Sequence, residues 1–143
     1  MAIKEISYGI VIVRDSKILL LRSFDHWDFP KGKPEKDETP LATALRETFE
    51  ETSLKEISFP WGEEFKETEP YKKKTKVARY FVGKCDSGDV QLLPNPESGL
   101  VEHHEFRWLS IDEALELVKD RLKPILDWSK QKSGISNGEN QKS

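Results

Sequence analysis

The chain has 143 residues, a length typical of a single domain with a buried core. Its 26 acidic and 23 basic residues leave a net charge of -3, which disfavours a protein that holds long nucleic acids through their phosphates. The single cysteine excludes an internal disulfide and a cysteine-based zinc site, and no apolar run reaches the roughly 18 residues of a membrane span. These features favour a reducing, cytoplasmic setting.

The first 37 residues predict a β-hairpin followed by a long loop. Residues 7–13 and 17–22 show the β-branched, alternating pattern of strands, and the polar pair at 15–16 suits a tight turn between them. Residues 23–37 are rich in Asp, Lys and Pro, which predicts a loop with a short extended piece at residues 27–29.

A helix is expected next, from Pro40 to about Ser53. Thr39 suits the N-cap because its side chain can accept a hydrogen bond from a free backbone N–H, and Pro40 suits the first helical position. Four residues recur at the helical period and predict one buried stripe: Leu41, Leu45, Thr48 and Thr52.

The second half predicts further strands and two helical segments. Strands are expected at residues 56–65, 77–84, 90–93 and 106–109. Ser110 is expected to cap a helix at residues 111–119, and another helical segment follows Pro124. Residues 130–143 have almost nothing to bury, which predicts a disordered tail after a domain at residues 1–129. This order of elements predicts an α/β fold with a mixed sheet sandwiched between helices, an α/β/α sandwich.

Glu47, Glu50 and Glu51 share one face of the expected helix, because they are spaced i, i+3 and i+4. Carboxylates this close repel one another unless a cation lies among them, and a hard divalent cation with oxygen ligands, Mg²⁺ above all, is the natural partner. The alternative is a solvated acidic face balanced by Arg46, which is common on protein surfaces.

The spacing around these glutamates favours the functional interpretation. In order along the chain, the spaced residues are Gly32, Glu38, Arg46-Glu47, Glu50-Glu51 and Leu54. This pattern resembles the Nudix box, a loop-helix-loop unit with a glycine, a glutamate, an Arg-Glu pair, a Glu-Glu pair and a closing glycine-aliphatic step. The resemblance extends over most of residues 5–128, and it implies the Nudix fold and hydrolysis of a phosphoanhydride.

Two positions depart from the box. Thr48 stands at a usually aliphatic position, and Ser53 replaces the closing glycine. A serine in a left-handed conformation at a helix end costs about 1 kcal/mol relative to glycine, so we expect an effect on stability before any effect on chemistry.

The resemblance implies a role for each residue of the box. The carboxylates of Glu47, Glu50 and Glu51 and the carbonyl oxygen of Gly32 are implied as metal ligands. Bound Mg²⁺, or Mn²⁺ in its place, would activate a water that attacks phosphorus. Arg46 is implied to orient a box glutamate and Glu38 to brace the loop, while the general base stays open among the glutamates. The implied catalytic set is Arg46, Glu47, Glu50 and Glu51.

Three flanking segments resemble the asymmetrical diadenosine tetraphosphate hydrolases, at residues 25–33, 74–81 and 102–110. This resemblance implies a fourth carboxylate near the metals, Glu102, and cleavage to ATP and AMP. Substrate contacts are expected from four lysines and a tyrosine: Lys31, Lys33, Tyr71, Lys73 and Lys76. The ring would stack on adenine while lysines hold the polyphosphate, although a short lysine run is also typical of a solvated turn.

Other functions stay open at this stage. An RNA 5′-pyrophosphohydrolase, or another hydrolase of nucleoside diphosphates linked to a further group, would use the same chemistry. A nucleotide-binding module without activity would require a broken carboxylate set, whereas the three helix glutamates are intact. His103 and His104 face opposite ways on a strand, so at most one can reach the site, and a surface or satisfied position is expected for each. The expected partners are a small nucleotide or an RNA 5′ end, with no membrane, and the chain is expected to be a monomer.

Overall fold

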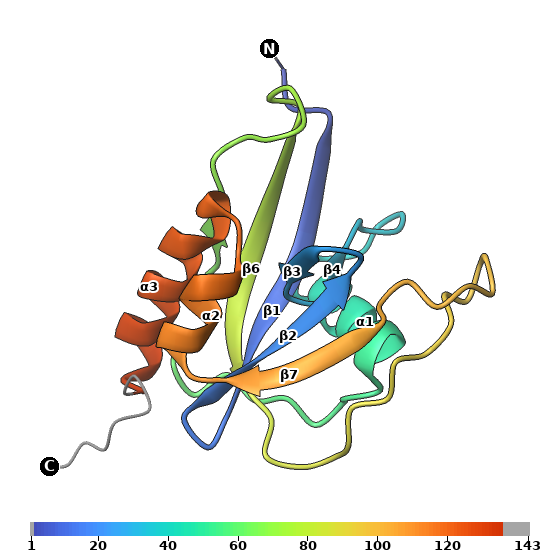
Figure 1. Ribbon diagram of the computed structural model, residues 1–143. Coiled ribbons are helices and arrows are strands. Elements are labelled where there is room, and N and C mark those ends of the chain that lie inside the picture. The colour runs from blue at the N-terminus through green and yellow to red at the C-terminus, as the bar shows by residue number, and fades with distance from the viewer. Residues whose placement is uncertain (1, 136–143) are drawn as a thin grey trace, which may run out of the picture.

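The computed structural model describes residues 2–135 and places one β-sheet between helices (Figure 1). The strands are β1 (Glu5–Arg14), β2 (Lys17–Ser23), β3 (His26–Asp28), β4 (Lys31–Gly32), β5 (Lys66–Glu67), β6 (Lys76–Lys84) and β7 (Glu105–Leu109). The helices are α1 (Pro40–Thr52), α2 (Ile111–Leu117) and α3 (Lys123–Ser133), with the short 3₁₀ helix η1 (Asp120–Leu122) before α3.

The sheet is mixed. Its strand order is β3-β2-β1-β6-β5, with β4 paired to β1 and β7 paired to β2. Strands β1 and β6 run parallel, and the other strand pairs are antiparallel. Helix α1 covers one face and helices α2 and α3 cover the other, each over its own apolar core (Figure 1). The predicted α/β/α sandwich is therefore confirmed. Within residues 2–135, no helix combines the length and the apolar character needed to cross a membrane.

The N-terminal hairpin forms as the sequence predicts. Strands β1 and β2 pair with Arg14 opposite Lys17, so the turn consists of Asp15 and Ser16. Both turn residues have positive φ, 52° and 62°, which is the geometry of a tight turn that matches the twist of the strands.

Helix α1 has the predicted start and end. The Thr39 side chain accepts a hydrogen bond from the N–H of Ala42, and Pro40 occupies the first turn. The helix ends at Ser53, which adopts the left-handed conformation with φ 69° and donates its N–H to the carbonyl of Phe49. Ser53 Oγ also bonds to the Asp89 carbonyl at 3.1 Å, which offsets part of the cost of a serine there.

The buried face of α1 differs from the predicted stripe. Thr48 and Thr52 are fully buried, but Leu41 and Leu45 are only partly buried. The remaining buried positions are Thr43 and Ala44. Small side chains on the face toward the sheet let the helix approach β1 closely, and the two leucines pack at the edge of the core under α1.

Two predicted strands are wrong. Residues 56–65 form an irregular segment with a single bridge between Ser58 and Lys84, and the short strand β5 begins only at Lys66. Residues 90–93 are also irregular. Apolar residues of both segments pack on the core under α1: Ile57, Phe59, Val90 and Leu92. The alternating apolar side chains of these segments therefore cover one face of the sheet, while their backbones do not join it as strands.

The C-terminal boundaries also shift. Helix α2 ends at Leu117, two residues before the predicted end, and η1 follows it. Helix α3 continues to Ser133 and is closed by left-handed Gly134, so the disorder predicted from residue 130 is wrong for the last turn of this helix. Ile135 packs against the core under α2 and α3. The rest of the expected tail, residues 136–143, lies outside the described residues.

Thr48 and Thr52 form a matched pair for a stability test, because both are fully buried on α1. Thr48 Oγ1 has no hydrogen-bond partner, whereas Thr52 Oγ1 donates to the Thr48 carbonyl at 2.6 Å and accepts from the N–H of Leu54 at 3.1 Å. We expect Thr48→Val to raise the free energy of unfolding by about 1 kcal/mol and Thr52→Val to lower it by about 1–2 kcal/mol. Urea unfolding measures both, and a less stable Thr48→Val protein contradicts the expectation.

Candidate active site

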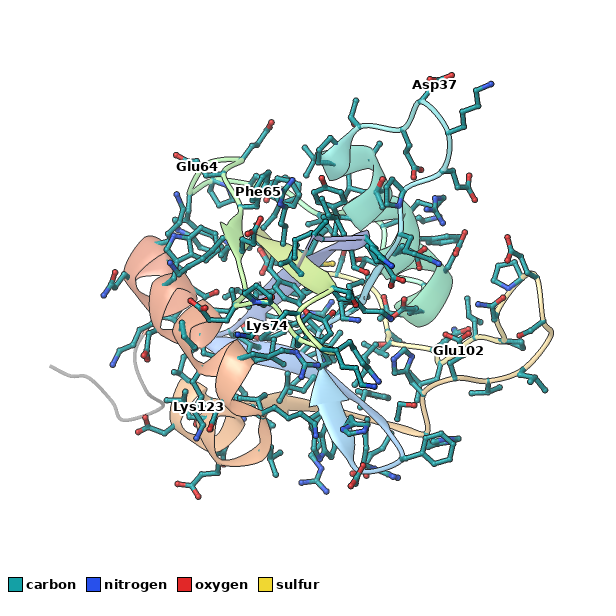
Figure 2. The ribbon with its side chains drawn as sticks, turned by 90° about the horizontal axis from the view of Figure 1, so that it is seen from above. Asp37, Glu64, Phe65, Lys74, Glu102 and Lys123 are labelled. Atoms are coloured by element: carbon teal, nitrogen blue, oxygen red, sulfur yellow. The ribbon has the colours of Figure 1, made fainter. Side chains whose placement is uncertain are left out.

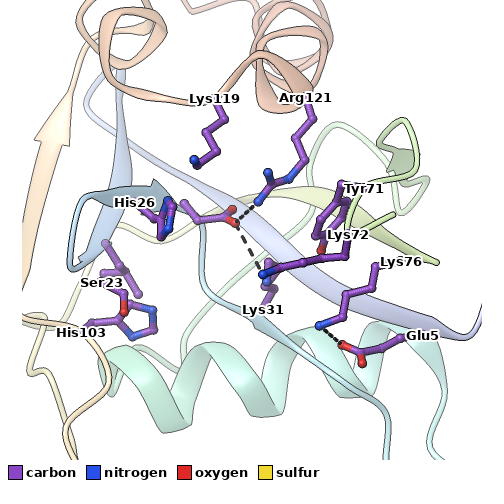
Figure 3. Close-up of a pocket in the computed structure, with 12 residues that line it drawn as sticks. Glu5, Ser23, His26, Lys31, Tyr71, Lys72, Lys76, His103, Lys119 and Arg121 are labelled. Atoms are coloured by element: carbon purple, nitrogen blue, oxygen red, sulfur yellow. Dashed lines mark ion pairs between the residues drawn. The ribbon is translucent and has the colours of Figure 1, made fainter. Parts of the chain in front are cut away.

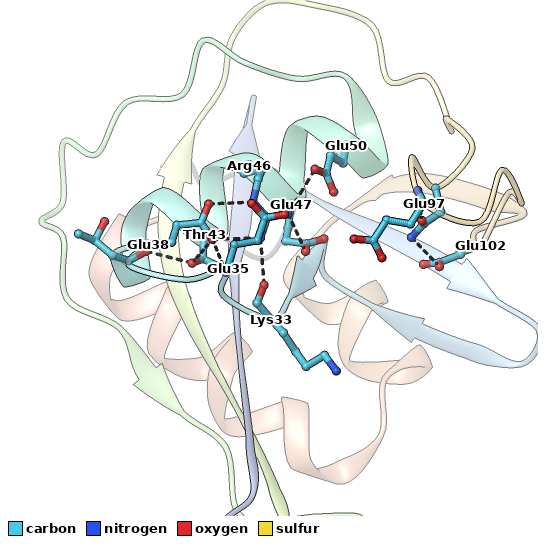
Figure 4. A network of polar contacts seen from close by, with 11 residues as sticks. Lys33, Glu35, Glu38, Thr43, Arg46, Glu47, Glu50, Glu97 and Glu102 are labelled. Carbon is cyan, nitrogen blue, oxygen red and sulfur yellow. Dashed lines mark hydrogen bonds and ion pairs between the residues drawn. The ribbon is translucent and has the colours of Figure 1, made fainter.

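Arg46 ties the loop before α1 to the helix itself (Figure 4). Its Nε donates to Glu38 Oε2 at 2.8 Å, and its Nη2 donates to Glu38 Oε1 at 3.0 Å and to the Lys33 carbonyl at 2.9 Å. Its Nη1 donates to Glu47 Oε2 at 3.1 Å and to Glu50 Oε2 at 3.2 Å. The planar guanidinium thus orients three glutamates of the box, Glu38, Glu47 and Glu50, so Arg46 is a positioning residue.

Glu38 acts as the acceptor that holds this loop. Besides Arg46, it accepts hydrogen bonds from Thr43 Oγ1 at 2.8 Å and from the backbone N–H of Glu35 at 2.9 Å. The Arg46 hydrogen bond is the largest reason that the pKa of Glu38 falls from 4.5 to about 2. The geometry matches the bracing role that the sequence predicts.

Gly32 allows the loop to approach α1. A Cβ at this position would overlap the carboxylate of Glu47, so a larger residue would displace that carboxylate from its place beside the loop. The register of β4 on β1, with Tyr8 opposite Gly32, fixes this approach.

Glu47 and Glu51 lie against each other and are largely buried, with side chains 17% and 13% exposed. Burial raises the pKa of Glu51 well above its usual value, and the neighbouring Glu47 charge raises it further. Burial also raises the pKa of Glu47, although its hydrogen bond with Glu51 and the charge of Arg46 oppose this. Two carboxyl groups this close oppose each other's ionisation, so a cation between them would stabilise the charged form of both.

An open cleft of about 490 Å³ contains these groups, and we call it the acidic cleft. Its side chains include seven carboxylates, those of Glu5, Glu35, Glu47, Glu50, Glu51, Glu97 and Glu102. Figure 2 shows Glu102 on the long loop that precedes β7, on the side of the molecule that carries α1. Asn95 donates to Glu102 Oε2 at 2.9 Å and positions it (Figure 4). The structure therefore brings together the four carboxylates that the sequence predicts as ligands.

These residues suit a hard divalent cation by the chemistry of their donors, because carboxylate and carbonyl oxygens predominate and charge is left over. With the side chains as they stand, no three His, Cys, Asp or Glu residues between 2 and 135 converge on a common point for a metal ion. Arg46 accounts for this in part, since it holds Glu47 and Glu50 by one oxygen each. Their other oxygens are the ones that could turn to a cation.

His103 lies in this site, contrary to the surface or satisfied position expected for it. Its Nε2 is 3.8 Å from Glu51 Oε1, and its side chain is 18% exposed. Burial lowers the pKa of His103 below its usual 6.5, so the ring is neutral at pH 7 and is a hydrogen-bonding group there. His104 points the other way, and its ring packs edge-to-face on exposed Phe24, as expected for a surface residue.

A second cavity of about 350 Å³ adjoins the acidic cleft, and we call it the basic cavity (Figure 3). Its cationic side chains are Lys31, Lys72, Lys76, Lys119 and Arg121, against the carboxylates of Glu5 and Asp28. Lys31 and Glu5 line both spaces. The molecule thus places an acidic and a basic surface side by side.

Side chains from several elements line the basic cavity (Figure 3). Arg121 descends from η1, and its guanidinium lies 4.1 Å from the centre of the Tyr71 ring. Asp28 accepts a hydrogen bond from buried Tyr80 Oη at 2.8 Å and lies 3.9 Å from both Lys31 Nζ and Arg121 Nη2. Burial lowers the pKa of Lys31. The nearby negative charges, among them those of Asp28 and Glu51, raise this pKa by more, so the lysine stays cationic.

Most of the predicted substrate contacts line one of these spaces. Lys31 lines both, Lys33 lines the acidic cleft, and Tyr71 and Lys76 line the basic cavity. Lys73 lines neither, so its prediction is not supported.

Four cavity residues lie outside the set of predicted substrate contacts: Lys72, His103, Lys119 and Arg121. Lys72 stands in the same lysine run as Lys73, and only the path of the turn tells the two apart. Lys119 and Arg121 follow α2 in sequence, in a segment without any motif, and no pattern signals that they reach the cavity.

Comparison with known proteins identifies the family. Residues 4–129 match the NUDIX domain. The chain belongs to the Nudix family. It is therefore a Nudix hydrolase, an enzyme of the pyrophosphohydrolase type, as the box predicts.

Individual relatives carry more specific names. The asymmetrical bis(5′-nucleosyl)-tetraphosphatase of Rattus norvegicus is 35% identical over 108 residues, which cover 72% of this chain and 70% of that protein. An RNA pyrophosphohydrolase of Azorhizobium caulinodans is 31% identical over 108 residues, which cover 64% of this chain and 63% of that one. A crystal structure of a C. elegans Ap4A hydrolase binary complex superposes with a TM-score of 0.73 at 25% identity, covering 92% of this chain and 99% of that chain.

The Glu38–Arg46 pair should make stability depend on pH. Because the folded state lowers the pKa of Glu38 from 4.5 to about 2, its contribution is present above pH 4.5 and is lost as the pH falls from there toward 2. We expect Glu38→Gln to be less stable than the unchanged protein at pH 7, with a gap that closes on acidification. Thermal unfolding between pH 3 and 7 measures the gap.

Glu35→Gln is the matched control, because Glu35 belongs to the same loop but is 63% exposed and lies 3.8 Å from Arg46. Its effect on stability should be small at every pH. A Glu38→Gln gap that stays constant across this range would be inconsistent with the proposed bond.

Proposed function

We propose that this Nudix hydrolase cleaves dinucleoside polyphosphates, with diadenosine tetraphosphate hydrolysed to ATP and AMP. The observation that supports it most is the basic cavity beside the acidic cleft, with Lys31 common to both. A substrate with one phosphate among the carboxylates leaves several further phosphates and a nucleoside to be held, and five cationic side chains line the adjoining space. The names of the rat and C. elegans relatives support the same substrate.

The residues that would hold divalent metal are Glu47, Glu50, Glu51 and Glu102, together with the carbonyl oxygen of Gly32. Mg²⁺ is the proposed ion and Mn²⁺ an alternative. When bound, the ion would neutralise phosphate charge and lower the pKa of a water. In the cleavage, the water oxygen forms a bond to phosphorus and loses a proton to a general base among the glutamates, while the anhydride P–O bond breaks and its electron pair leaves with the phosphate oxygen.

The chain's own residues bind and orient. Lys31, held as a cation at the boundary of the two spaces, is placed to pair with the phosphates next to the cleaved bond. The Tyr71 ring supplies an aromatic face for a base, as the sequence predicts, and Arg121 already covers part of it. Arg46 keeps Glu47 and Glu50 in place, and neutral His103 supplies a hydrogen-bonding group beside Glu51.

A product screen with Mg²⁺ tests the proposed reaction. We expect diadenosine tetraphosphate to give equal amounts of ATP and AMP, and two molecules of ADP would contradict the asymmetric cleavage. Glu51→Gln should lower kcat/KM by at least about 100-fold, which is about 2.7 kcal/mol of transition-state stabilisation, with the fold kept. Glu97→Gln serves as the matched control, because Glu97 lines the same cleft but is exposed.

The same screen distinguishes the competing functions. Pyrophosphate release from triphosphorylated RNA that is faster than dinucleotide cleavage would favour the RNA 5′-end function, in keeping with the Azorhizobium relative. Nucleotide binding by calorimetry without turnover at saturating Mg²⁺ would favour an inactive binding module. Turnover by Glu51→Gln at the original rate would refute its assignment as a ligand.

Lys72 and Lys73 offer a sharp test of substrate binding. They are consecutive, exposed and left-handed, yet only Lys72 lines the basic cavity. We expect Lys72→Gln to raise KM for the dinucleotide about 3- to 10-fold, because a charge that pairs with phosphate contributes on the order of 1 kcal/mol. Lys73→Gln should leave KM unchanged. Equal effects of the two substitutions on steady-state kinetics would show that only overall charge matters.

A further inference from the structure

Glu5 occupies the boundary between the acidic cleft and the basic cavity. It is the first residue of β1, its side chain is 28% exposed, and it is the carboxylate that lines both spaces. A chain of phosphates that extends from the cleft into the cavity has to pass this boundary.

The contacts of Glu5 are with one lysine from each space. Its Oε2 lies 3.2 Å from Lys76 Nζ in the basic cavity (Figure 3). Its Oε1 lies 4.0 Å from Lys33 Nζ in the acidic cleft. Each of its two oxygens therefore occupies a place where a phosphate oxygen could pair with a lysine.

Asp28, the other carboxylate of the basic cavity, is bound differently. Its Oδ1 accepts hydrogen bonds from Tyr80 Oη at 2.8 Å and from the backbone N–H of Phe29 at 2.7 Å. These two hydrogen bonds fix Asp28 to the sheet, in addition to its 3.9 Å ion pairs with Lys31 and Arg121. Glu5 is engaged instead by two flexible lysine side chains, which can exchange one anion for another.

We propose that Glu5 is a specificity-determining residue that competes with the phosphate chain for Lys33 and Lys76. The proposal builds on the function proposed above, since it concerns the same site. Glu5 neutralises the two lysines in the free protein and repels a phosphate that enters between them. The repulsion grows with the number of charged phosphates near the boundary, so Glu5 weakens the binding of long chains more than that of short ones.

The test is calorimetric titration of Glu5→Gln with tripolyphosphate and with pyrophosphate, in EDTA so that no divalent metal takes part. Glutamine keeps the shape of the side chain and removes its charge. We expect the Kd for tripolyphosphate to fall about 3- to 10-fold, and the Kd for pyrophosphate to fall by less. The gain should shrink in about 0.5 M salt, because screening weakens exposed charge pairs.

Glu67→Gln is the matched control. It changes the net charge equally, but Glu67 pairs with Arg79 at 2.8 Å on the surface and lines neither space. Its effect on tripolyphosphate binding should be close to none. Glu5→Thr, which suits a strand residue, removes the same charge with a different shape and should reproduce the Glu5→Gln result.

An unchanged or weaker affinity for tripolyphosphate in both Glu5 variants overturns the proposal, and weaker binding would mean that Glu5 positions the lysines for the ligand. The increase in tripolyphosphate affinity caused by Glu5→Gln should also vanish when Lys33 and Lys76 are both replaced by glutamine, because Glu5 is proposed to act through these two lysines. Because these titrations need no cleavage, they stand apart from the product screen. Tighter tripolyphosphate binding without dinucleotide cleavage keeps the role of Glu5 and rejects the proposed substrate.

Discussion

The candidate site depends on the imbalance between one arginine and the carboxylates around it. The Arg46 guanidinium donates hydrogen bonds to Glu38, Glu47 and Glu50, and these bonds fix the loop to α1. Glu51 receives nothing from it and lies buried against Glu47, where burial and repulsion raise its pKa well above the usual value. The repulsion between Glu47 and Glu51 is thus a cost in stability that a cation in the proposed metal site would relieve.

Strand β4 separates the two electrostatic environments. Successive residues of a strand point to opposite sides, so Gly32 meets Glu47 on the side of α1 while Lys31 is directed toward Asp28. The pairing of β4 with β1 holds both residues in register. The Glu47 carboxylate at Gly32 and the Lys31–Asp28 ion pair therefore lie close together in space, at successive residues of β4. In the proposed function, this arrangement would let one phosphate chain meet the carboxylates at one end and the lysines at the other.

Local patterns in the sequence predicted what local interactions build. The turn of the first hairpin and the Thr39 cap of α1 depend on neighbouring residues, and so does the spacing of the helix glutamates, which made all three predictable. The strands expected at 56–65 and 90–93 failed because alternation shows which side chains are buried, not whether the backbone joins a sheet. Arg121 reaches Tyr71 only through the packing of η1 on the sheet, so no local pattern could reveal it.

The turn after Tyr71 shows why the sequence alone could not tell which lysine of the run 72–74 lines the basic cavity. Lys72, Lys73 and Lys74 all have positive φ, and a left-handed residue other than glycine costs roughly 1–2 kcal/mol. The turn persists because Thr75 bonds back to Tyr71 and because the carbonyl of Thr75 accepts the N–H groups at the start of β1. Those bonds fix which lysine faces the cavity. The same bonds connect the turn to Glu5, because the Glu5 N–H donates to the Thr75 carbonyl. A shift of the strained turn or of Glu5 would therefore change how the lysines contact a phosphate chain.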